Sequence, residues 1–455
     1  MRKKIVIIGF APLPHEDPAR LYAGSIRTDA FCQVLKRDND VMLLGMRIPG
    51  SYDKEKELPV IINDKSQGFD YFSINDKHFG EIKKREELAK NFSPDIIVGV
   101  NSLPSYYAAM LNLRIPFWAD LNGSLLCEFQ LKASAEKDEY YTWHFFGIER
   151  AIIKTADKFS VVSEYQKYEL IGELASIKRI NAVNSFYDFV HVIQNPVMPM
   201  NYEHKKNVFR GKIIPEDAFV VLWTGGYNYW TDVKLLFNGI TAAMKRNSKI
   251  YFVSLGGGIQ AHNNKTFNNF LKLINDSDIK NRFHFAGWVK TSEVPDYYFE
   301  SDIGINIDGY SYETFTGGRN RINDMMNAGL PVLTTEGPEI TKIIKDKDLG
   351  FTFKIGDVNG FTDKLLKLAK MSKTDLKEKG FRSKNFAKEN WNYEKILSEF
   401  LLWLKDPQKS PDNLLKRYFK RKDYLNNIIE FLVTAKNPSL FMKRFKEKMR
   451  AFTDA

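Results

Sequence analysis

The chain alternates between short runs of apolar and β-branched residues and stretches with helical patterns, and it does so in two successive series. In the first half the short runs read KKIVIIGF, DVMLLGM, PVIIND, DIIVGVN, PFWADLN, FSVVSE and VHVIQN, and helix-like stretches such as 26–36 and 134–154 separate several of them. Apolar strands alternating with helices are typical of a parallel sheet covered by helices on both faces. Residues 1–197 are therefore expected to form a doubly wound α/β domain.

A second series begins after the NPVMP segment and a polar stretch. Its runs read FVVLWTGG, KIYFVSLGGG, RFHFAGW, DIGINID, LPVLTT and LGFTFKI, again with helical patterns between them. We expect a second Rossmann-like domain over 205–385, followed by an amphipathic helix over 386–405 with Trp391 near its start. Two doubly wound domains face a shared cleft in such proteins, and ligands bind at the carboxyl ends of the strands. The predicted fold class is thus α/β with two such domains.

Cysteine, histidine and apolar patterns exclude several classes of protein. Cys32 and Cys127 are far apart and neither has a CxxC partner, which argues against a disulfide framework or a thiolate metal site. The histidines show no HxxxH or HxH spacing, so no metal ion is expected. No apolar run approaches the ~18 residues of a membrane-spanning helix, and the N-terminal apolar run is too short for a signal peptide. These features predict a cytoplasmic protein.

Positive charge is concentrated at the C-terminal end of the chain. Residues 407–455 hold 12 Lys and Arg against 5 Asp and Glu, so +7 of the net charge of +11 lies there. Apolar residues recur among the basic ones at helical spacing. Basic amphipathic helices bind anionic membrane surfaces, which predicts attachment at the inner face of the membrane; the alternative is a helical appendage packed on the body or on a partner protein. Because the rest of the chain is only mildly basic, nucleic acid is not an expected partner.

The segment TFTGGRNRINDMMNAGLPVLTT carries the strongest functional signal. It predicts a loop with the pair Gly317-Gly318, then a helix, a tight turn at Gly-Leu-Pro and a buried strand. Arg319 and Arg321 lie at the expected helix start, where backbone N–H groups favour phosphate and arginine adds paired donors for phosphate oxygens. Asp324 follows about one turn later and can accept hydrogen bonds from ribose hydroxyls. The segment predicts a nucleoside diphosphate site, with a solvated basic loop as the alternative.

Glycines follow two other strands of the second series. Gly225 and Gly226 end one run, and Gly257 lies in the triple glycine that ends the next. Glycine permits close approach of the backbone to a ligand, and strand ends of this kind line the cleft of doubly wound domains. A plain turn explains any one of these positions, but their recurrence within one domain favours a binding site.

Together these features resemble the GT-B glycosyltransferases, in particular the retaining, sugar-nucleotide-dependent group that contains bacterial glycan-assembly enzymes. The resemblance covers roughly residues 1–405 and is carried by WTGGYNYWTDVKLL, FHFAGWV and the segment ending in AGLPVLTT. It implies a first domain on the acceptor side, a second domain that binds the nucleoside diphosphate sugar, and a C-terminal helix that returns towards the first domain. It also implies a reaction that needs no metal, because cationic side chains and a helix N-terminus stabilise the leaving diphosphate.

The chain departs from the family pattern in two places. Many members carry an arginine and a lysine in the loop that grips the diphosphate, whereas this loop reads GGYNYWTDVK, with Asn228 inside it and Lys234 late. Many members also carry two glutamates spaced E-x7-E. Here Asp324 falls at the second of these positions and Thr316 at the first. The resemblance therefore assigns the ribose to Asp324.

The same comparison with the family gives expectations for catalysis. Arg319 and Arg321 are expected to replace the missing cationic grip on the diphosphate. Glu313 lies three residues before the position of the first family glutamate, and together with Asp308 it is a candidate for contact with the donor sugar.

In the first domain, YAGSIRTDAF resembles the glycine-containing loop that closes over the donor phosphates. Gly24 permits close approach and Arg27 is expected to reach the diphosphate, although a helix start with a surface arginine explains this segment equally well. WADLNGSLLCEFQ resembles the strand end where many members place a histidine. Asn122 stands there and can orient a sugar hydroxyl but cannot act as a general base. Glu128 and Gln130 are candidates for the acceptor side.

The function implied by the resemblance is transfer of a sugar from a nucleoside diphosphate sugar to a hydroxyl of a glycan or lipid-linked acceptor, as in bacterial polysaccharide biosynthesis. Three alternatives remain. One is a sugar-nucleotide epimerase on the same fold. Another is a DNA-base glucosyltransferase, but the mild charge of the body argues against it because a duplex groove needs many phosphate contacts. The third is a catalytically degenerate subunit that scaffolds a partner transferase, and the altered diphosphate loop is the best support for it.

Overall fold

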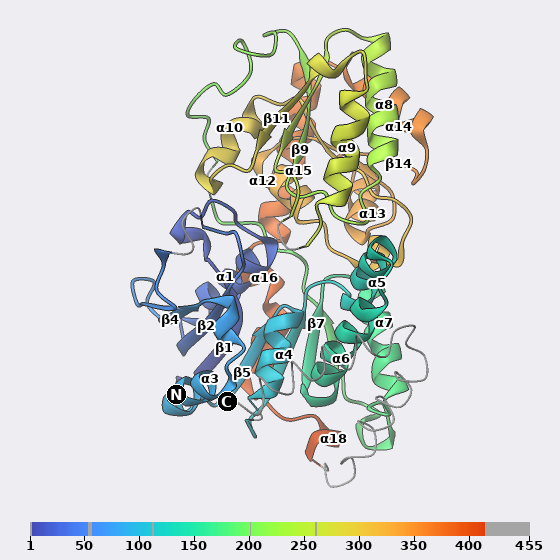
Figure 1. The fold of residues 1–455 in the computed structure, drawn as a ribbon. Coiled ribbons are helices and arrows are strands. Elements are labelled where there is room, and N and C mark those ends of the chain that lie inside the picture. The colour runs from blue at the N-terminus through green and yellow to red at the C-terminus, as the bar shows by residue number, and fades with distance from the viewer. Residues whose placement is uncertain (1, 53–56, 112, 201, 260–261, 415–455) are drawn as a thin grey trace.

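The computed structural model describes the chain except for residues 1, 53–56, 112, 201, 260–261 and 415–455. The described residues form two α/β domains, one above the other in Figure 1, each with a central sheet between layers of helices. The predicted architecture of two doubly wound α/β domains is confirmed.

The first domain contains an eight-stranded sheet in the order β3-β4-β2-β1-β5-β6-β7-β8, in which every neighbouring pair is parallel except β3 with β4. Its inner strands are the apolar runs of the sequence, and they are buried because helices cover both faces. The strands are β1 (Lys4–Ala11), β2 (Asp40–Arg47), β3 (Ile61–Asp64), β4 (Asp70–Ile74), β5 (Ile96–Val100), β6 (Phe117–Leu121), β7 (Lys158–Val161) and β8 (Val190–Val192). The helices are η1 (Pro14–Glu16), α1 (Ala23–Leu35), α2 (Asp76–Phe79), α3 (Ile82–Phe92), α4 (Ser102–Met110), α5 (Leu125–Glu136), α6 (Tyr140–Thr155), α7 (Glu164–Ser176) and η3 (Ala182–Asn184).

The second domain contains a six-stranded, fully parallel sheet in the order β11-β10-β9-β12-β13-β14. The strands are β9 (Phe219–Thr224), β10 (Ile250–Leu255), β11 (Phe283–Gly287), β12 (Ile303–Asn306), β13 (Val332–Thr335) and β14 (Phe351–Phe353). Its helices are α8 (Val233–Arg246), α9 (Lys265–Asn275), η4 (Lys280–Arg282), η5 (Thr291–Glu293), α10 (Val294–Phe299), α11 (Tyr312–Thr316), α12 (Asn320–Ala328), α13 (Glu339–Asp346), α14 (Val358–Leu368) and α15 (Lys373–Asn390). Three further helices follow α15 and contact the first domain: α16 (Tyr393–Ile396), α17 (Ser398–Lys405) and α18 (Pro411–Leu414).

Three elements differ from the sequence-based expectation. Strand β4 was not predicted, although it pairs with both β2 and the antiparallel edge strand β3. The single helix expected over 134–154 is two helices, α5 and α6, because the chain turns at Lys137 in the left-handed region (φ 55°). The helix expected to start near Trp391 instead ends there, since Trp391 follows the last residue of α15. The domain limit expected at 385/386 therefore falls inside α15.

The chain crosses between the domains twice, and α12 holds one of the crossings. The Asn323 side-chain amide donates to the carbonyl of Asn195 (2.8 Å), and that of Asn327 donates to the carbonyl of Met198 (2.9 Å). The two crossings also contact each other, because the Val197 N–H donates to the carbonyl of Trp391 (2.9 Å). Helix α12, which lies within the predicted nucleotide-binding segment, is thus fixed to the connection between the domains.

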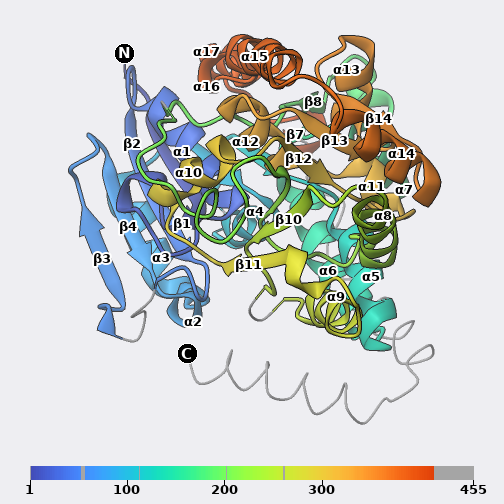
Figure 2. The same ribbon diagram turned by 90° about the horizontal axis from the view of Figure 1, so that it is seen from above.

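After the second crossing, at Trp391, helices α16 and α17 pack on the first domain. Seen from above in Figure 2, α15, α16 and α17 all lie on the same side of the molecule. The Tyr393 hydroxyl lies 3.1 Å from Asp29 Oδ2, and the rings of Phe400 and Trp403 lie 5.0 and 5.2 Å from Trp118. Burial of these aromatic side chains ties the C-terminal helices to the sheet of the first domain.

The start of the basic tail is docked on the first domain. Arg179 makes a two-point ion pair with Asp412 (2.7 and 3.1 Å) and donates to Ser410 Oγ (2.8 Å). The Ser410 N–H donates to Asp157 Oδ1 (3.0 Å). The predicted membrane-binding or partner-binding tail itself lies, from residue 415 on, outside the described residues.

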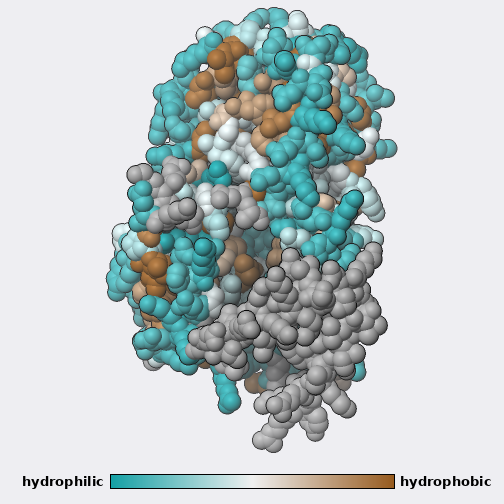
Figure 3. All heavy atoms as spheres, viewed as in Figure 1, coloured by the Kyte–Doolittle hydropathy of each residue, from teal (hydrophilic) through white to brown (hydrophobic). Residues whose placement is uncertain are grey.

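Apolar side chains of the described residues gather in three clusters. One lies inside the first domain and one inside the second. The third covers the other face of the first sheet and continues through the interdomain connection into the second domain. On the face drawn in Figure 3, hydrophilic side chains predominate in both domains, with hydrophobic ones gathered in patches. Among the helices that the structure describes, none is both long and apolar enough to cross a membrane.

Candidate active site

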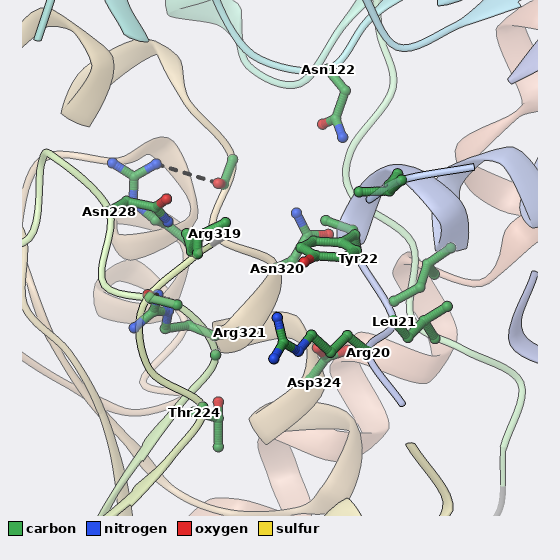
Figure 4. Close-up of a pocket in the computed structure, with 18 of the residues that line it drawn as sticks. Arg20, Leu21, Tyr22, Asn122, Thr224, Asn228, Arg319, Asn320, Arg321 and Asp324 are labelled. Carbon is green, nitrogen blue, oxygen red and sulfur yellow. Dashed lines mark hydrogen bonds between the residues drawn. The ribbon is translucent and has the colours of Figure 1, made fainter. Parts of the chain in front are cut away.

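A cavity of about 580 Å³ lies between the two domains. The second domain lines it with the ends of β9, β10 and β11 and with the first residues of α12; the first domain contributes the loop before α1, the loop after β6 and α5 (Figure 4). Carboxyl ends of parallel strands are where doubly wound domains bind ligands. The lining includes these predicted residues: Asn122, Gly225, Gly226, Asn228, Glu313, Gly317, Gly318, Arg319, Arg321 and Asp324.

The glycine-rich strand ends approach each other closely at the floor of the cavity. Gly225 (φ 83°) and Gly256 (φ 106°) both adopt backbone conformations that favour glycine. A Cβ on Gly256 would lie 2.3 Å from the carbonyl oxygen of Gly225, so no larger residue fits there. The predicted Gly257 is not among the lining residues; its carbonyl accepts from the Tyr227 N–H (3.2 Å). Gly256, its neighbour, is the lining residue of this turn.

Substituting Gly256→Ala should disrupt this floor. The strained φ alone costs about 1–3 kcal/mol, and the clash with a backbone oxygen adds to it. We expect the melting temperature, measured by calorimetry, to fall. Gly147→Ala is the matched control, because Gly147 lies inside α6 with nothing within 4 Å of the added Cβ; it should be neutral or stabilising by up to about 1 kcal/mol. A Gly256→Ala protein as stable as Gly147→Ala would contradict this account of the turn.

The N-terminus of α12 opens into the cavity. The first N–H groups of a helix have no intrahelical partner and carry partial positive charge. Gly317 and Gly318 precede this end of the helix, and neither tolerates a side chain: a Cβ on Gly317 would lie 2.1 Å from Glu313 Oε1, and one on Gly318 would lie 2.2 Å from Asn195 Nδ2. The two glycines therefore let the chain pass between the ion pair of the second domain and the interdomain connection.

Arg319 is enclosed by carboxylates and does not present a free guanidinium to the cavity. Its Nη1 and Nη2 lie 3.0 and 2.8 Å from the two oxygens of Glu313, and its Nε lies 2.9 Å from Asp308 Oδ2. The side chain is only 3% exposed, and the two carboxylates raise its pKa although burial opposes them. Burial raises the pKa of Glu313 to about 7, with Arg319 acting in the opposite direction.

Arg321 is the cation of this helix that remains available. Its guanidinium lies 3.9 Å from the ring centroid of Trp223, and Nη2 donates to the carbonyl of Gly226 (2.6 Å). Nη1 is buried and has no hydrogen-bond partner among the described residues. Burial lowers the pKa of Arg321 to about 10, so it still carries its charge at neutral pH. A buried cation with an unsatisfied N–H is suited to an anionic ligand oxygen.

Asp324 lines the same cavity one turn further along α12, and its carboxylate has no hydrogen bond or ion pair among the described residues. Burial raises its pKa to about 7. A buried carboxyl that lacks a partner gains most from ligand hydroxyls that donate to it.

Arg27 does not occupy the position that the sequence comparison gave it. Its Nε and Nη2 form a two-point ion pair with Asp120 (2.6 and 2.7 Å), and the remaining donors reach Gln194, Asn195 and Ile193. All five N–H groups of this fully buried side chain are used, and it is absent from the cavity lining. In this structure Arg27 joins α1 to β6 and to the interdomain connection, and it is not one of the residues at the cavity that the expected contact with the diphosphate requires.

Gly24 lies next to the cavity and supports Asn122 through a chain of hydrogen bonds. It is not a lining residue, and a Cβ there would lie 2.7 Å from the Phe10 ring. Its carbonyl accepts from the Asn101 amide (3.0 Å), and Asn101 Oδ1 accepts in turn from the Asn122 amide (3.1 Å). This chain of hydrogen bonds fixes Asn122, which leaves its carbonyl oxygen for a ligand.

Other acceptor-side candidates separate into two groups. Glu128 lines the cavity, where burial and the nearby Glu313 raise its pKa to about 7, and it lies 3.5 Å from His262 Nε2 of the second domain. Gln130 is exposed and is not a lining residue, and neither is Lys234, which lies on α8.

Arg20 and Trp288 are two of the lining residues that have no counterpart among the sequence-based candidates. Arg20 lies in the loop before α1, and Trp288 follows β11 in the FAGWV segment; the guanidinium of Arg20 lies 5.3 Å from the Trp288 ring centroid. Trp288 follows a strand as the glycine pairs do, so position alone could have suggested it. No pattern distinguishes Arg20 from a surface arginine.

No group of three or more His, Cys, Asp or Glu side chains suited to a metal ion occurs within the described part of the chain.

Comparison with known proteins agrees with this architecture. Residues 218–371 match the family described as Glycosyl transferases group 1. The Anabaena protein HepE, solved with UDP and glucose, has a TM-score of 0.62 at 13% identity, over 89% of this chain and 100% of that chain. The sucrose-phosphate synthase of Thermosynechococcus elongatus has a TM-score of 0.61 at 16% identity, over 89% of this chain and 99% of that chain. A Rickettsia africae glycosyltransferase has a TM-score of 0.57 at 17% identity, over 91% and 99%.

No curated protein sequence matches the chain. The matched family segment spans β9 to α14, which is the whole sheet of the second domain and the half of the cavity that holds α12. The structural neighbours extend the likeness to both domains. The protein therefore has the two-domain GT-B fold, and residues 218–371 within it match the Glycosyl transferases group 1 family.

Proposed function

We propose that this protein transfers a sugar from a nucleoside diphosphate sugar to a hydroxyl of a glycan or lipid-linked acceptor, with retention of configuration and without a metal ion. One observation carries this proposal. The N-terminal part of α12 places two groups on the wall of a cavity between the domains: Arg321, whose Nη1 has no hydrogen-bond partner among the described residues, and the carboxyl of Asp324, which has no hydrogen bond or ion pair to them. Phosphate and ribose hydroxyls satisfy these two groups together.

In this proposal the donor lies on the second domain. Arg321 and the first N–H groups of α12 bind the diphosphate, the glycine turn at Gly225-Gly226 lets it approach the backbone, and Asp324 accepts from the ribose. Arg319 holds Glu313 at the end of the cavity where the donor sugar lies. Structural neighbours support this assignment, since the Anabaena protein was solved with UDP and with UDP-glucose.

The reaction breaks the bond between the anomeric carbon and the diphosphate and forms a bond from that carbon to the acceptor oxygen. The acceptor proton passes to an oxygen of the leaving diphosphate, so no protein base is required. The charge that develops on the diphosphate is stabilised by Arg321 and by the helix N-terminus, which are fixed before the reaction begins. Asn122 orients the acceptor hydroxyl from the first domain, and closure of the two domains excludes water.

A thermal-shift screen of the full chain against UDP, GDP, ADP and their sugars, with and without EDTA, tests the donor site. A ligand that binds only the native state must raise the melting temperature by mass action. We expect one nucleotide family to raise it, with no effect of EDTA, and Arg321→Gln to abolish the shift. If no nucleotide raises the melting temperature, the donor-site assignment is wrong. If the increase disappears when EDTA is added, the proposal that the site works without a metal ion is wrong.

A non-catalytic scaffold of a partner transferase is the second candidate. It is favoured by the small number of available cations, because Lys234 lies outside the cavity and Arg319 is neutralised by two carboxylates. Nucleotide binding combined with neither donor hydrolysis nor transfer to any acceptor pool would support this alternative over the enzyme.

A further inference from the structure

We propose that Arg20, in the loop before α1, binds the donor's diphosphate from the first domain, opposite Arg321 of the second. This inference rests on the proposed function and adds a binding residue to it. Its basis is the charge of the cavity lining, the surroundings of the Arg20 side chain and the contacts of its loop.

The cavity has few free cations for an anionic ligand. Among the residues that the structure describes, the basic ones in its lining are three arginines and one histidine. Burial lowers the pKa of His262 to about 4, so this ring is neutral at physiological pH. Arg319 is neutralised by Glu313 and Asp308. Arg20 and Arg321 remain. The diphosphate of a nucleoside diphosphate sugar carries two negative charges, which the two arginines would match.

The Arg20 guanidinium is free of polar partners. None of its nitrogens has a hydrogen bond or an ion pair to the described residues, and its contact is the face of Trp288, 5.3 Å from the ring centroid. Stacking on an aromatic ring holds an arginine while leaving its N–H groups directed outward. Figure 4 shows this side chain extending from the first domain into the cavity that also holds Arg321 and Asp324. The Arg20 guanidinium is thus held in position by Trp288, while its N–H groups have no hydrogen-bond partner among the described residues.

The loop that carries Arg20 bridges the two domains, and we call residues 17–22 the bridging loop. The backbone N–H of Arg20 donates to the carbonyl of Ser51 (3.1 Å) within the first domain. Asp17 accepts from both the N–H and the hydroxyl of Ser292 in the second domain (3.2 and 3.1 Å). Trp288 is itself fixed, because its Nε1–H donates to the carbonyl of Gly258 (3.1 Å). The Arg20 side chain is therefore held over the cavity by contacts on both sides of it.

A diphosphate bound by Arg20 and Arg321 would contact one cation from each domain. The ligand then stabilises the arrangement in which the two domains face each other at this distance, because neither domain alone offers both charges. Nucleosides without phosphates lack this contribution, which gives the inference a specific signature.

Isothermal titration calorimetry of the full chain with UDP, GDP and ADP, each beside its nucleoside, tests the inference. Loss of one charge-assisted contact should weaken the nucleoside diphosphate by about 10- to 100-fold in Arg20→Gln, while the affinity for the nucleoside stays unchanged. Arg20→Lys keeps the charge and should recover part of the loss. Arg37→Gln is the matched control, since Arg37 is an exposed arginine of the same domain paired with Glu394, and it should bind as wild type does.

The outcomes separate the inference from the proposed function. A wild-type protein that binds none of the three nucleoside diphosphates defeats the proposed function itself. A wild-type protein that binds, with Arg20→Gln binding equally well, overturns the role of Arg20 alone. Equal weakening of nucleoside and nucleoside diphosphate would also overturn it, because that result indicates a displaced loop and not a lost phosphate contact.

Discussion

Arg319→Ala is expected to lower the free energy of unfolding by about 3–5 kcal/mol, because it leaves two buried carboxylates without their cation. Glu313 and Asp308 both lie against the guanidinium, at 2.8 and 2.9 Å, and are 5% and 1% exposed. Without Arg319 the carboxyl of Glu313 must be protonated or hydrated, and either change disturbs the chain at Gly317, which packs directly on it. Urea denaturation monitored by circular dichroism measures the loss, and nucleotide binding should fall with it.

Arg246→Ala provides the matched comparison. Arg246 pairs with Asp363 at 3.1 Å, but both side chains are more than half exposed, so its removal should cost under about 1 kcal/mol. If Arg319→Ala proved as stable as Arg246→Ala, the buried cluster would not be holding the loop before α12. That result would favour a direct contact between Arg319 and the diphosphate.

Asp324→Asn is expected to stabilise the ligand-free protein at pH 8 while abolishing most nucleotide affinity. Burial raises the pKa of Asp324 from 3.8 to about 7, so the folded state holds this proton more tightly than the unfolded state. Stability contributed by this group is therefore full below its unfolded pKa and is lost as the pH rises through 7. Asparagine has no charge to desolvate, and the gain at pH 8 should be on the order of 2 kcal/mol, shrinking towards pH 4.

Chemical denaturation of wild type and variant between pH 4 and 8 measures this difference. Asp348→Asn is a control of opposite sign, because Lys379 and Arg382 lower the pKa of the exposed Asp348. Asp348 stabilises the fold above its unfolded pKa, and its contribution disappears as the pH falls. A stability gap for Asp324→Asn that does not change with pH would show that the carboxyl is not desolvated in the fold.

The layers of the fold were predictable because buried parallel strands leave continuous apolar runs. All six strands of the second sheet and seven of the eight in the first coincide with such runs. Strand β4 (Asp70–Ile74) was missed because DYFSI is short and alternates in burial beside an antiparallel edge strand, which leaves little contrast with a loop. The break between α5 and α6 was missed because the left-handed residue there is Lys137, and lysine carries no turn signal.

The sequence indicated where in the fold the candidate site lies, but it did not indicate which of its arginines are available to a ligand. Glycines after strands and a helix start after Gly317-Gly318 follow from local chemistry, and most of the residues that they indicated line one wall of the cavity. Which arginine is free depends on partners distant in sequence. Arg27 is neutralised by Asp120, 93 residues away, and no local pattern contains that information.

The grip of α12 on the interdomain connection has a mechanical consequence. Asn323 and Asn327 fix the passing backbone on one side of this helix, while Arg321 and Asp324 face the cavity on another. A rotation of one domain against the other must therefore either move α12 together with the connection or break these two hydrogen bonds. The angle between the domains and the orientation of the phosphate-binding end of α12 are coupled in this way, so a ligand bound in the cavity would fix both.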